Sequence, residues 1–141
     1  MVLGPERFTE RAQESLNNSQ LILSRYRHNQ WDCEHILMAL IEQEKGVPAE
    51  ILNELGVNIN VFHSRLHAML ENSDKTGGLS NQIYETPRLN ELFARADAEA
   101  KRLNDEFIGA EHLLVALTQE DTGEASEVLE EFGISTEMVY Q

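Results

Sequence analysis

The sequence predicts an all-α protein in which one four-helix unit occurs twice in tandem, and two observations lead to this prediction. Residues 9–64 align with residues 86–141 without a gap, and self-similarity at a fixed offset indicates a repeat architecture. Apolar residues recur at steps of three and four in both copies, and no alternating apolar run is long enough for a strand. Identical pairs include Thr9/Thr86, Arg11/Arg88, Glu14/Glu91, Arg25/Arg102, Glu34/Glu111, His35/His112, Leu40/Leu117, Gly46/Gly123, Leu52/Leu129 and Gly56/Gly133.

The repeat also predicts the domain organisation. A chain of 141 residues has the length of one ordinary domain, which we expect to cover residues 1–141. Within it we expect the first repeat at residues 6–71 and the second at residues 86–141. Residues 72–85 lose the helical spacing and contain two adjacent glycines, which are typical of loops, so they are interpreted as a linker.

In the first repeat, caps and breakers predict where each helix begins and ends. The boundary residues are Thr9 and Arg27 for the first helix, Asp32 and Gly46 for the second, Pro48 and Gly56 for the third, and Asn58 as cap of the fourth. The residues expected to face the core are Phe8, Ala12, Leu16, Leu23, Tyr26, Ile36, Leu37, Leu40, Ile41, Ile51, Leu52, Leu55, Ile59, Phe62, Leu66, Met69 and Leu70.

The second repeat restarts with an N-cap and a proline at Thr86-Pro87. Its core-facing residues are expected to be Leu89, Leu92, Phe93, Ala96, Ala100, Leu103, Ala125, Val128, Leu129 and Phe132, with the sixth helix at about residues 110–119 and a stop at Gly133. The eighth helix, capped by Ser135, reaches Gln141 after about two turns, which is too short for a helix that is stable by itself. We therefore expect the chain to be a fragment of a longer polypeptide.

Composition and charge limit the possible functions. The chain has 25 acidic and 11 basic residues and a formal net charge of −14, which repels nucleic-acid phosphates and anionic lipids. We therefore expect neither nucleic-acid nor membrane binding. A single cysteine excludes an internal disulfide, no apolar run approaches the ~18 residues of a membrane span, and no signal peptide is recognisable. These features favour a cytoplasmic protein.

Two glutamates, Glu34 and Glu111, occupy equivalent positions in the first turn of a helix in each repeat. One interpretation is a solvated side chain that stabilises its helix start, because the helix dipole favours an anion there. The alternative is a pair of like sites, each with a carboxylate beside free backbone N–H groups at the helix starts of Thr9 and Thr86. Carboxylates bind guanidinium groups and helix N-termini bind anions, so a phosphorylated arginine would suit such a site.

Other candidate residues have simpler interpretations. His35 and His112 follow these glutamates directly, and adjacent residues do not share a helix face, so each is expected to pack and hydrogen-bond at its helix start. Cys33 lies where a helix N-terminus would lower the pKa of a thiol, but a packing role is the better interpretation because the second copy has alanine there. Trp31 and its counterpart Ile108 are expected to be buried.

His63, His67 and Glu71 are candidates for a metal site, because two histidines four residues apart on a helix can ligate zinc. The apolar stripe of that helix lies elsewhere, so we interpret the histidines as part of an exposed polar face. The chain has no Walker-type loop, no Gly-x-Ser-x-Gly and no Cys-x-x-Cys motif. We expect no catalytic residue, no metal and no cofactor.

Three motifs together resemble the N-terminal repeat domain of Clp chaperone ATPases. They are Glu-Arg-Phe-Thr-Glu-Arg-Ala-Gln at residues 6–13, the doubled Glu-His-(Ile/Leu)-Leu helix start at Glu34 and Glu111, and Tyr-Glu-Thr-Pro-Arg at residues 84–88. The resemblance extends over nearly the whole chain, with the ClpC type first and the ClpB type second. It implies a pseudo-twofold bundle of two four-helix repeats.

The resemblance further implies a function. Such domains receive substrate proteins and adaptor proteins for AAA+ rings, which unfold the substrates and, in the ClpC type, pass them to a Clp peptidase; the ATPase modules would lie beyond Gln141. In ClpC-type domains the two repeat glutamates bind phosphoarginine, a role that falls by position on Glu34 and Glu111, with Thr9 and Thr86 beside them. Asp32 departs from the family pattern and adds a negative charge to the first site.

Three alternatives remain open on the sequence. A stand-alone regulator would have the repeat domain without an ATPase, and a ClpB-type disaggregase domain would not be expected to read phosphoarginine. The third alternative is a metal-dependent enzyme that uses the histidine pair.

Overall fold

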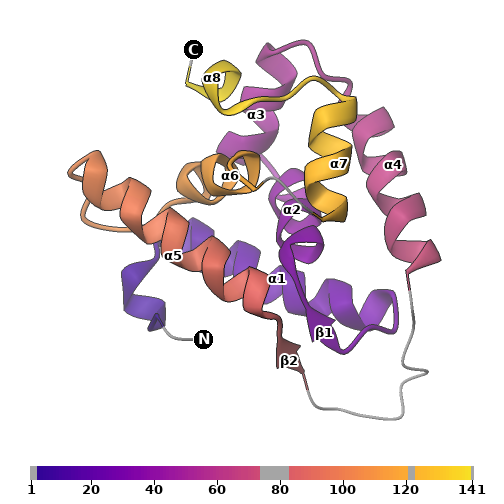
Figure 1. Cartoon of the computed structure of the whole chain (residues 1–141), viewed down its shortest axis with the longest axis horizontal. Coiled ribbons are helices and arrows are strands. Elements are labelled where there is room, and N and C mark those ends of the chain that lie inside the picture. Colours follow the sequence, from indigo (N-terminus) through magenta and orange to yellow (C-terminus); the bar gives the residue numbers. More distant parts are fainter. Residues whose placement is uncertain (1–2, 74–82, 121–122, 141) are drawn as a thin grey trace.

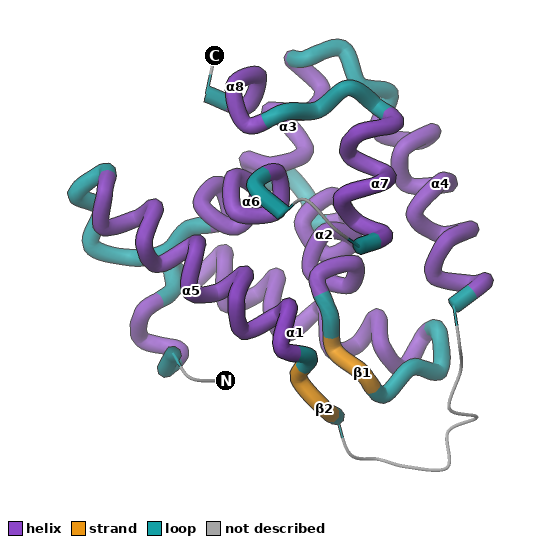
Figure 2. Tube along the Cα trace, in the orientation of Figure 1, coloured by secondary structure: helices purple, strands orange, loops and turns teal. Residues whose placement is uncertain are grey.

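The computed structural model describes residues 3–73, 83–120 and 123–140, and it confirms the all-α prediction (Figures 1 and 2). None of the helices described is long and apolar enough to cross a bilayer. The elements are the 3-10 helix Pro5–Arg7, α1 Glu10–Arg25, β1 Gln30–Trp31, α2 Cys33–Glu42, α3 Val47–Glu54, α4 Ile59–Asn72, β2 Tyr84–Glu85, α5 Pro87–Arg102, α6 Ala110–Thr118, α7 Glu124–Glu131 and α8 Thr136–Val139.

Helices α2 and α6 form the centre of the molecule, with the other helices around them (Figure 1). Nine of the ten residues of α2 are buried, as are seven of the nine residues of α6. A helix that is buried on all sides needs partners on all sides. The first helix of each repeat covers one side, because α1 packs against α2 and α5 packs against α6.

The remaining partners come from the other repeat. Helix α3 packs against α6, α7 packs against α2, and α4 also contacts α7. The two repeats therefore share one continuous core, which contains residues such as Ile36 and Leu37 from α2 together with Leu113 and Leu114 from α6.

Two backbone bridges join the repeats in an equivalent way. Strand β1 pairs in parallel with β2 (Figure 2). An isolated parallel bridge joins Phe8 to Ile108. As a result the N–H of Thr86 donates to the carbonyl of Trp31 at 3.2 Å, and the N–H of Thr9 donates to the carbonyl of Ile108 at 2.9 Å. Each bridge places the first helix start of one repeat next to the second helix start of the other.

The predicted caps are confirmed. The side chains of Thr9, Asn58, Thr86 and Ser135 each accept a hydrogen bond from a backbone N–H in the first turn of the following helix. Gly56 and Gly133 have left-handed backbone φ angles of 88° and 69°, as their stop positions require.

Several boundaries and burial assignments differ from the predictions. Helix α1 ends at Arg25 instead of near Arg27, because Arg27 adopts a left-handed φ of 60°. Leu103, expected in the core, is 42% exposed at the end of α5. Of the expected linker 72–85, residues 74–82 lie outside the described residues, whereas Asn72 ends α4 and Tyr84–Glu85 form β2. Trp31 and Ile108 are buried as predicted.

Candidate functional site

The structure brings each helix start that carries a candidate glutamate next to a threonine from the other repeat. The hydroxyl of Thr86 donates to Asp32 Oδ1 at 2.9 Å, so Thr86 lies at the start of α2, which carries Glu34. The backbone of Thr9 bonds to Ile108, directly before the start of α6, which carries Glu111. Each candidate site therefore combines residues of both repeats, and this crossing was not visible in the sequence.

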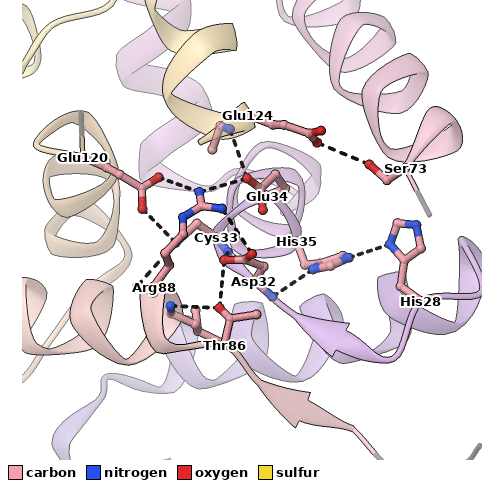
Figure 3. Close-up of polar contacts among 12 residues, drawn as sticks. His28, Asp32, Cys33, Glu34, His35, Ser73, Thr86, Arg88, Glu120 and Glu124 are labelled. Carbon is pink, nitrogen blue, oxygen red and sulfur yellow. Dashed lines mark hydrogen bonds and ion pairs between the residues drawn. The ribbon is translucent and has the colours of Figure 1, made fainter. Parts of the chain in front are cut away.

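The site at Glu34 is already engaged within the protein. Glu34 is only 6% exposed, and its Oε1 accepts a hydrogen bond from Arg88 Nη2 at 3.1 Å and one from the N–H of Ala125 at 3.2 Å. Ala125 lies in the first turn of α7, where unpaired N–H groups favour an anion (Figure 3). The interpretation of Glu34 as a solvated side chain at its helix start is therefore wrong.

Arg88 is the centre of this cluster. Besides Glu34, its guanidinium contacts Asp32 Oδ2 at 3.3 Å and Glu120 Oε1 at 3.1 Å (Figure 3). Burial lowers the pKa of Arg88, but the hydrogen bond to Glu120 and the charges of Glu34 and Asp32 outweigh it and raise that pKa above its ordinary value. Arg88 thus joins the start of α5 to the start of α2 and to Glu120, which follows α6, with a permanent positive charge.

Sequence reasoning missed Arg88 and Glu120 as members of the site. A signal for Arg88 existed, because it is one of the positions identical in both repeats. Glu120 could have been noticed because it differs from its counterpart in the first repeat, the neutral Gln43. Their meeting depends on the packing of α5 against the start of α2, which the sequence does not show.

Burial and charge also determine the state of the neighbouring acids. Burial and the charge of Asp32 raise the pKa of Glu34, while Arg88 opposes this rise. Cys33 Sγ donates to Glu120 Oε2 at 3.4 Å and lies 3.7 Å from the carbonyl of Arg88. Burial, then the negative charges of Glu120, Asp32 and Glu34, raise the pKa of the Cys33 thiol. The expected lowering by the helix N-terminus is therefore wrong, and the predicted packing role agrees with full burial.

The site at Glu111 is open instead. The Glu111 side chain is 48% exposed and makes no hydrogen bond to a guanidinium of the described chain. Arg11, the counterpart of Arg88, turns away from it, with Nη2 donating to the carbonyl of Glu44 at 2.5 Å and Nη1 lying 3.5 Å from Glu14. The expectation that repeat symmetry creates two like sites is therefore wrong.

Three sequence differences explain why the sites diverge. Pro48 stands where the other repeat has Ala125, and proline has no N–H to offer to Glu111. Gly109 replaces Asp32, so no carboxylate draws an arginine inward. Gln43 replaces Glu120, and its Nε2 donates to the carbonyl of Arg11 at 2.9 Å, which leaves the Arg11 side chain without a buried anion to meet.

The two repeat histidines stabilise helix starts, as predicted. His35 Nδ1 accepts from the N–H of Asp32 at 3.0 Å, and His112 Nδ1 accepts from the N–H of Gly109 at 2.8 Å. The other ring nitrogen of His35 lies 2.9 Å from His28 Nδ1. Burial and the neighbouring His28 lower the pKa of His35 to about 4, so this ring is neutral at pH 7.

The metal interpretation gains no support within the described residues. His63 Nε2 lies 2.7 Å from Glu42 Oε2, and His67 Nδ1 lies 2.6 Å from the hydroxyl of Tyr26. In the part of the chain that the structure describes, no three histidine, cysteine, aspartate or glutamate side chains are grouped to hold a metal ion.

A pocket of about 390 Å³ opens beside Glu34, between the start of α7 and the end of α4. Its lining includes Asp32, Glu34, Ser73, Arg88 and Glu124. Two of these lining residues bond to each other, since Glu124 Oε2 accepts from the hydroxyl of Ser73 at 3.3 Å (Figure 3).

Comparisons with known proteins agree with the fold. The family described as "Clp repeat (R) N-terminal domain" matches residues 7–132. The chain is 31% identical to Chaperone protein ClpB of Clostridium tetani, over 92% of this chain and 15% of that protein. It is 33% identical to the negative regulator of genetic competence ClpC/MecB of Bacillus subtilis, over 92% of this chain and 16% of that protein.

Among solved structures, the Hsp104 N-terminal domain from Candida albicans has a TM-score of 0.81 and 17% identity, covering 94% of this chain and 85% of that one. The chain spans only 15% and 16% of the length of the two curated relatives named above.

Proposed function

The chain belongs to the Clp repeat N-terminal domain family, and from this premise we propose that it docks substrate proteins and adaptor proteins for a Clp-type AAA+ ATPase. The match over residues 7–132 is the observation that carries the proposal. The ATPase ring and a Clp-type peptidase act as its partners in this proposal, and the repeat domain itself contributes binding instead of catalysis.

Within this function, we propose that the open site at Glu111 and Thr9 reads phosphoarginine on substrates. The exposed Glu111 carboxylate offers two oxygens to a guanidinium, and the start of α6 offers N–H groups to a phosphate. Glu34 and Thr86 stay candidates for the same role, but a ligand there must displace the contacts of Arg88 and Asp32. The open site is therefore the first to test.

Calorimetric titration with free phosphoarginine tests this role. We expect the wild-type chain to bind it and Glu111→Ala to lose at least tenfold in affinity, because a charge-assisted bidentate contact contributes about 1.5–3 kcal/mol. The matched control is Glu50→Ala, which removes an exposed glutamate from the first turn of α3. Absence of heat with the wild type would contradict phosphoarginine reading, and equal affinity in Glu111→Ala would contradict reading at the Glu111 site.

A ClpB-type disaggregase domain is the second candidate, because the relatives named ClpB and ClpC are similarly identical to this chain, at 31% and 33%. Failure of phosphoarginine binding together with binding to heat-aggregated protein would favour this candidate. The coding sequence downstream of residue 141 distinguishes a stand-alone regulator from both candidates. A Gly-x-x-x-x-Gly-Lys-(Ser/Thr) motif encoded there would indicate an ATPase.

A further inference from the structure

Gln43, the repeat counterpart of Glu120, is a buried side chain with one acceptor that the described chain does not use. It is 5% exposed, and its Nε2 donates to the carbonyl of Arg11 at 2.9 Å. Its Oε1 is buried and accepts no hydrogen bond from the described residues. Turning the amide around would place this oxygen against the Arg11 carbonyl, which is also an acceptor. A buried acceptor without a donor costs free energy, so a ligand that brings a donor to it gains affinity.

The site at Glu34 shows what an acceptor in this position binds. There Glu120 Oε1 and Glu34 Oε1 both accept from one nitrogen, Arg88 Nη2, each at 3.1 Å (Figure 3). Gln43 and Arg11 are the repeat counterparts of Glu120 and Arg88. Because Gln43 Nε2 is held at the Arg11 backbone, its Oε1 is the atom that corresponds to Glu120 Oε1, which binds a guanidinium.

Two glycines support the same correspondence. At Gly123, the guanidinium of Arg88 occupies the space that a Cβ would take. At its counterpart Gly46, the three atoms nearest to that space all belong to Gln43, and Oε1 lies 3.2 Å from it. The φ angles differ, 99° at Gly123 and −78° at Gly46, so the two glycines correspond in position and not in backbone shape. Since Arg11 turns away to the surface, its guanidinium does not take the place beside Gln43 Oε1 that the repeat assigns to it.

The charges at the two sites favour different guanidinium groups. Three carboxylates contact the guanidinium at the first site, whereas Glu111 is the one acid among the three equivalent positions at the open site. Gln43 and Gly109 are neutral replacements for the other two acids. Like charges a few ångströms apart repel, so a phosphate attached to a guanidinium meets less repulsion at the open site.

We infer that Gln43 is a ligand-binding residue of the open site, where its Oε1 accepts an N–H from the guanidinium of a bound phosphoarginine. The exposed Glu111 carboxylate now fills the space where a Cβ on Gly109 would lie, and it turns to accept from the same guanidinium. The neutral charge of Gln43 selects phosphorylated over unmodified arginine. This inference rests on the proposed reading of phosphoarginine and names the residue that supplies its second acceptor.

Calorimetric titrations with free phosphoarginine and free arginine test this role. Gln43→Met keeps the size of the side chain but removes the acceptor, and it should weaken phosphoarginine binding roughly tenfold, as expected for loss of a hydrogen bond to a charged group. The matched control is Gln119→Met, at an exposed position at the opposite end of α6 from Glu111, which should bind as the wild type does.

Gln43→Glu provides a test of specificity that a merely structural role would not pass. It introduces the charge that Glu120 has at the first site, so the affinity for phosphoarginine relative to arginine should fall roughly tenfold. A structural defect would weaken both ligands alike. An unchanged ratio of the two affinities would therefore overturn the selection by Gln43.

NMR of the wild type gives a measurement that does not depend on how the variants fold. The side-chain amide signals of Gln43, assigned from triple-resonance spectra, should shift when phosphoarginine is added. Unmoved Gln43 signals in a wild type that binds, or equal affinity of a folded Gln43→Met, would overturn the inference and leave the reading of phosphoarginine at Glu111 intact. Absence of binding by the wild type would instead remove the proposed reading, and this inference with it.

Discussion

At the scale of single residues, Arg88 and Arg11 show how one position that is identical in both repeats can have two structural roles. Arg88 is two-thirds buried among three carboxylates, whereas Arg11 lies on the surface and contacts a backbone carbonyl and Glu14. The residue type is the same, so the neighbours supplied by packing decide the role.

This difference predicts unequal costs of removing the two arginines. Arg88→Met should lower the free energy of unfolding by about 2–4 kcal/mol, because it leaves Glu34 and Glu120 buried without their cation. Arg11→Met is the matched control and should cost about 0.5 kcal/mol, as exposed ion pairs do. Urea denaturation at pH 7 measures both, and similar values for the two variants would refute the assigned role of Arg88.

His35 predicts a pH dependence of stability. Burial and the neighbouring His28 lower its pKa in the folded protein from the ordinary value of 6.5 to about 4. Between these pH values the unfolded chain binds a proton that the folded chain does not. The contribution of His35 to the free energy of unfolding is therefore highest above pH 6.5, where the ring is neutral in both states, and decreases as the pH falls toward 4.

The comparison of wild type with His35→Gln isolates this effect. From pH 7 to pH 5 the wild type should lose about 2 kcal/mol more unfolding free energy than the variant, since one proton contributes about 1.4 kcal/mol per pH unit. The raised pKa of Glu34 acts in the opposite direction but is present in both chains. His63→Gln controls for removal of a histidine near the surface, and parallel pH curves for wild type and His35→Gln would contradict the prediction.

At the scale of elements, both candidate sites are built from helix starts. The starts of α2, α5 and α7 meet at Glu34, so N–H groups, caps and acidic side chains gather in one place. Helix starts with unpaired N–H groups favour acids, and here Arg88 contacts three of these acids, whose summed charge exceeds its own.

The caps of α1 and α5 should therefore differ in strength. Thr9→Ala removes one cap bond, to the N–H of Ala12, and should cost about 1 kcal/mol. Thr86→Ala removes the cap bond to Leu89 and also the hydroxyl donated to Asp32, so about 2 kcal/mol is expected. Thermal and urea unfolding of the two variants measure the difference, and an equal cost would show that the bond to Asp32 contributes nothing.

At the scale of the whole molecule, the repeats are related in sequence but do not form separate cores. Helix α2 needs α7, and α6 needs α3, to bury their remaining faces. A helix such as α2, with nine of ten residues buried, would expose an apolar surface without the other repeat.

We therefore expect that neither half folds alone. A fragment of residues 6–71 should show low helicity and no cooperative thermal transition by circular dichroism. Mixed with a fragment of residues 83–141 it should regain helicity, because the shared core can then form. A cooperative transition in the isolated first fragment would show that its core is self-sufficient. The intact chain is the reference for both measurements.

The sequence by itself determined the helices and their duplication. Caps such as Thr9 and Thr86 and the stops at Gly56 and Gly133 act through bonds within a few residues, so they can be recognised locally. The buried roles of Trp31 and Ile108 followed from the aligned repeats in the same way.

Only the tertiary structure decided how the two candidate sites differ. The pairing of Glu34 with Arg88, and the exposure of Glu111, depend on which helix of one repeat reaches the start of a helix in the other. The contacts of Glu34 with Arg88 and Ala125 join residues 54 and 91 positions apart, and their energies arise from burial and from charges that meet only after packing. The sequence records the residue types along the chain, whereas the pKa shifts and ion pairs of this site follow from its three-dimensional neighbours.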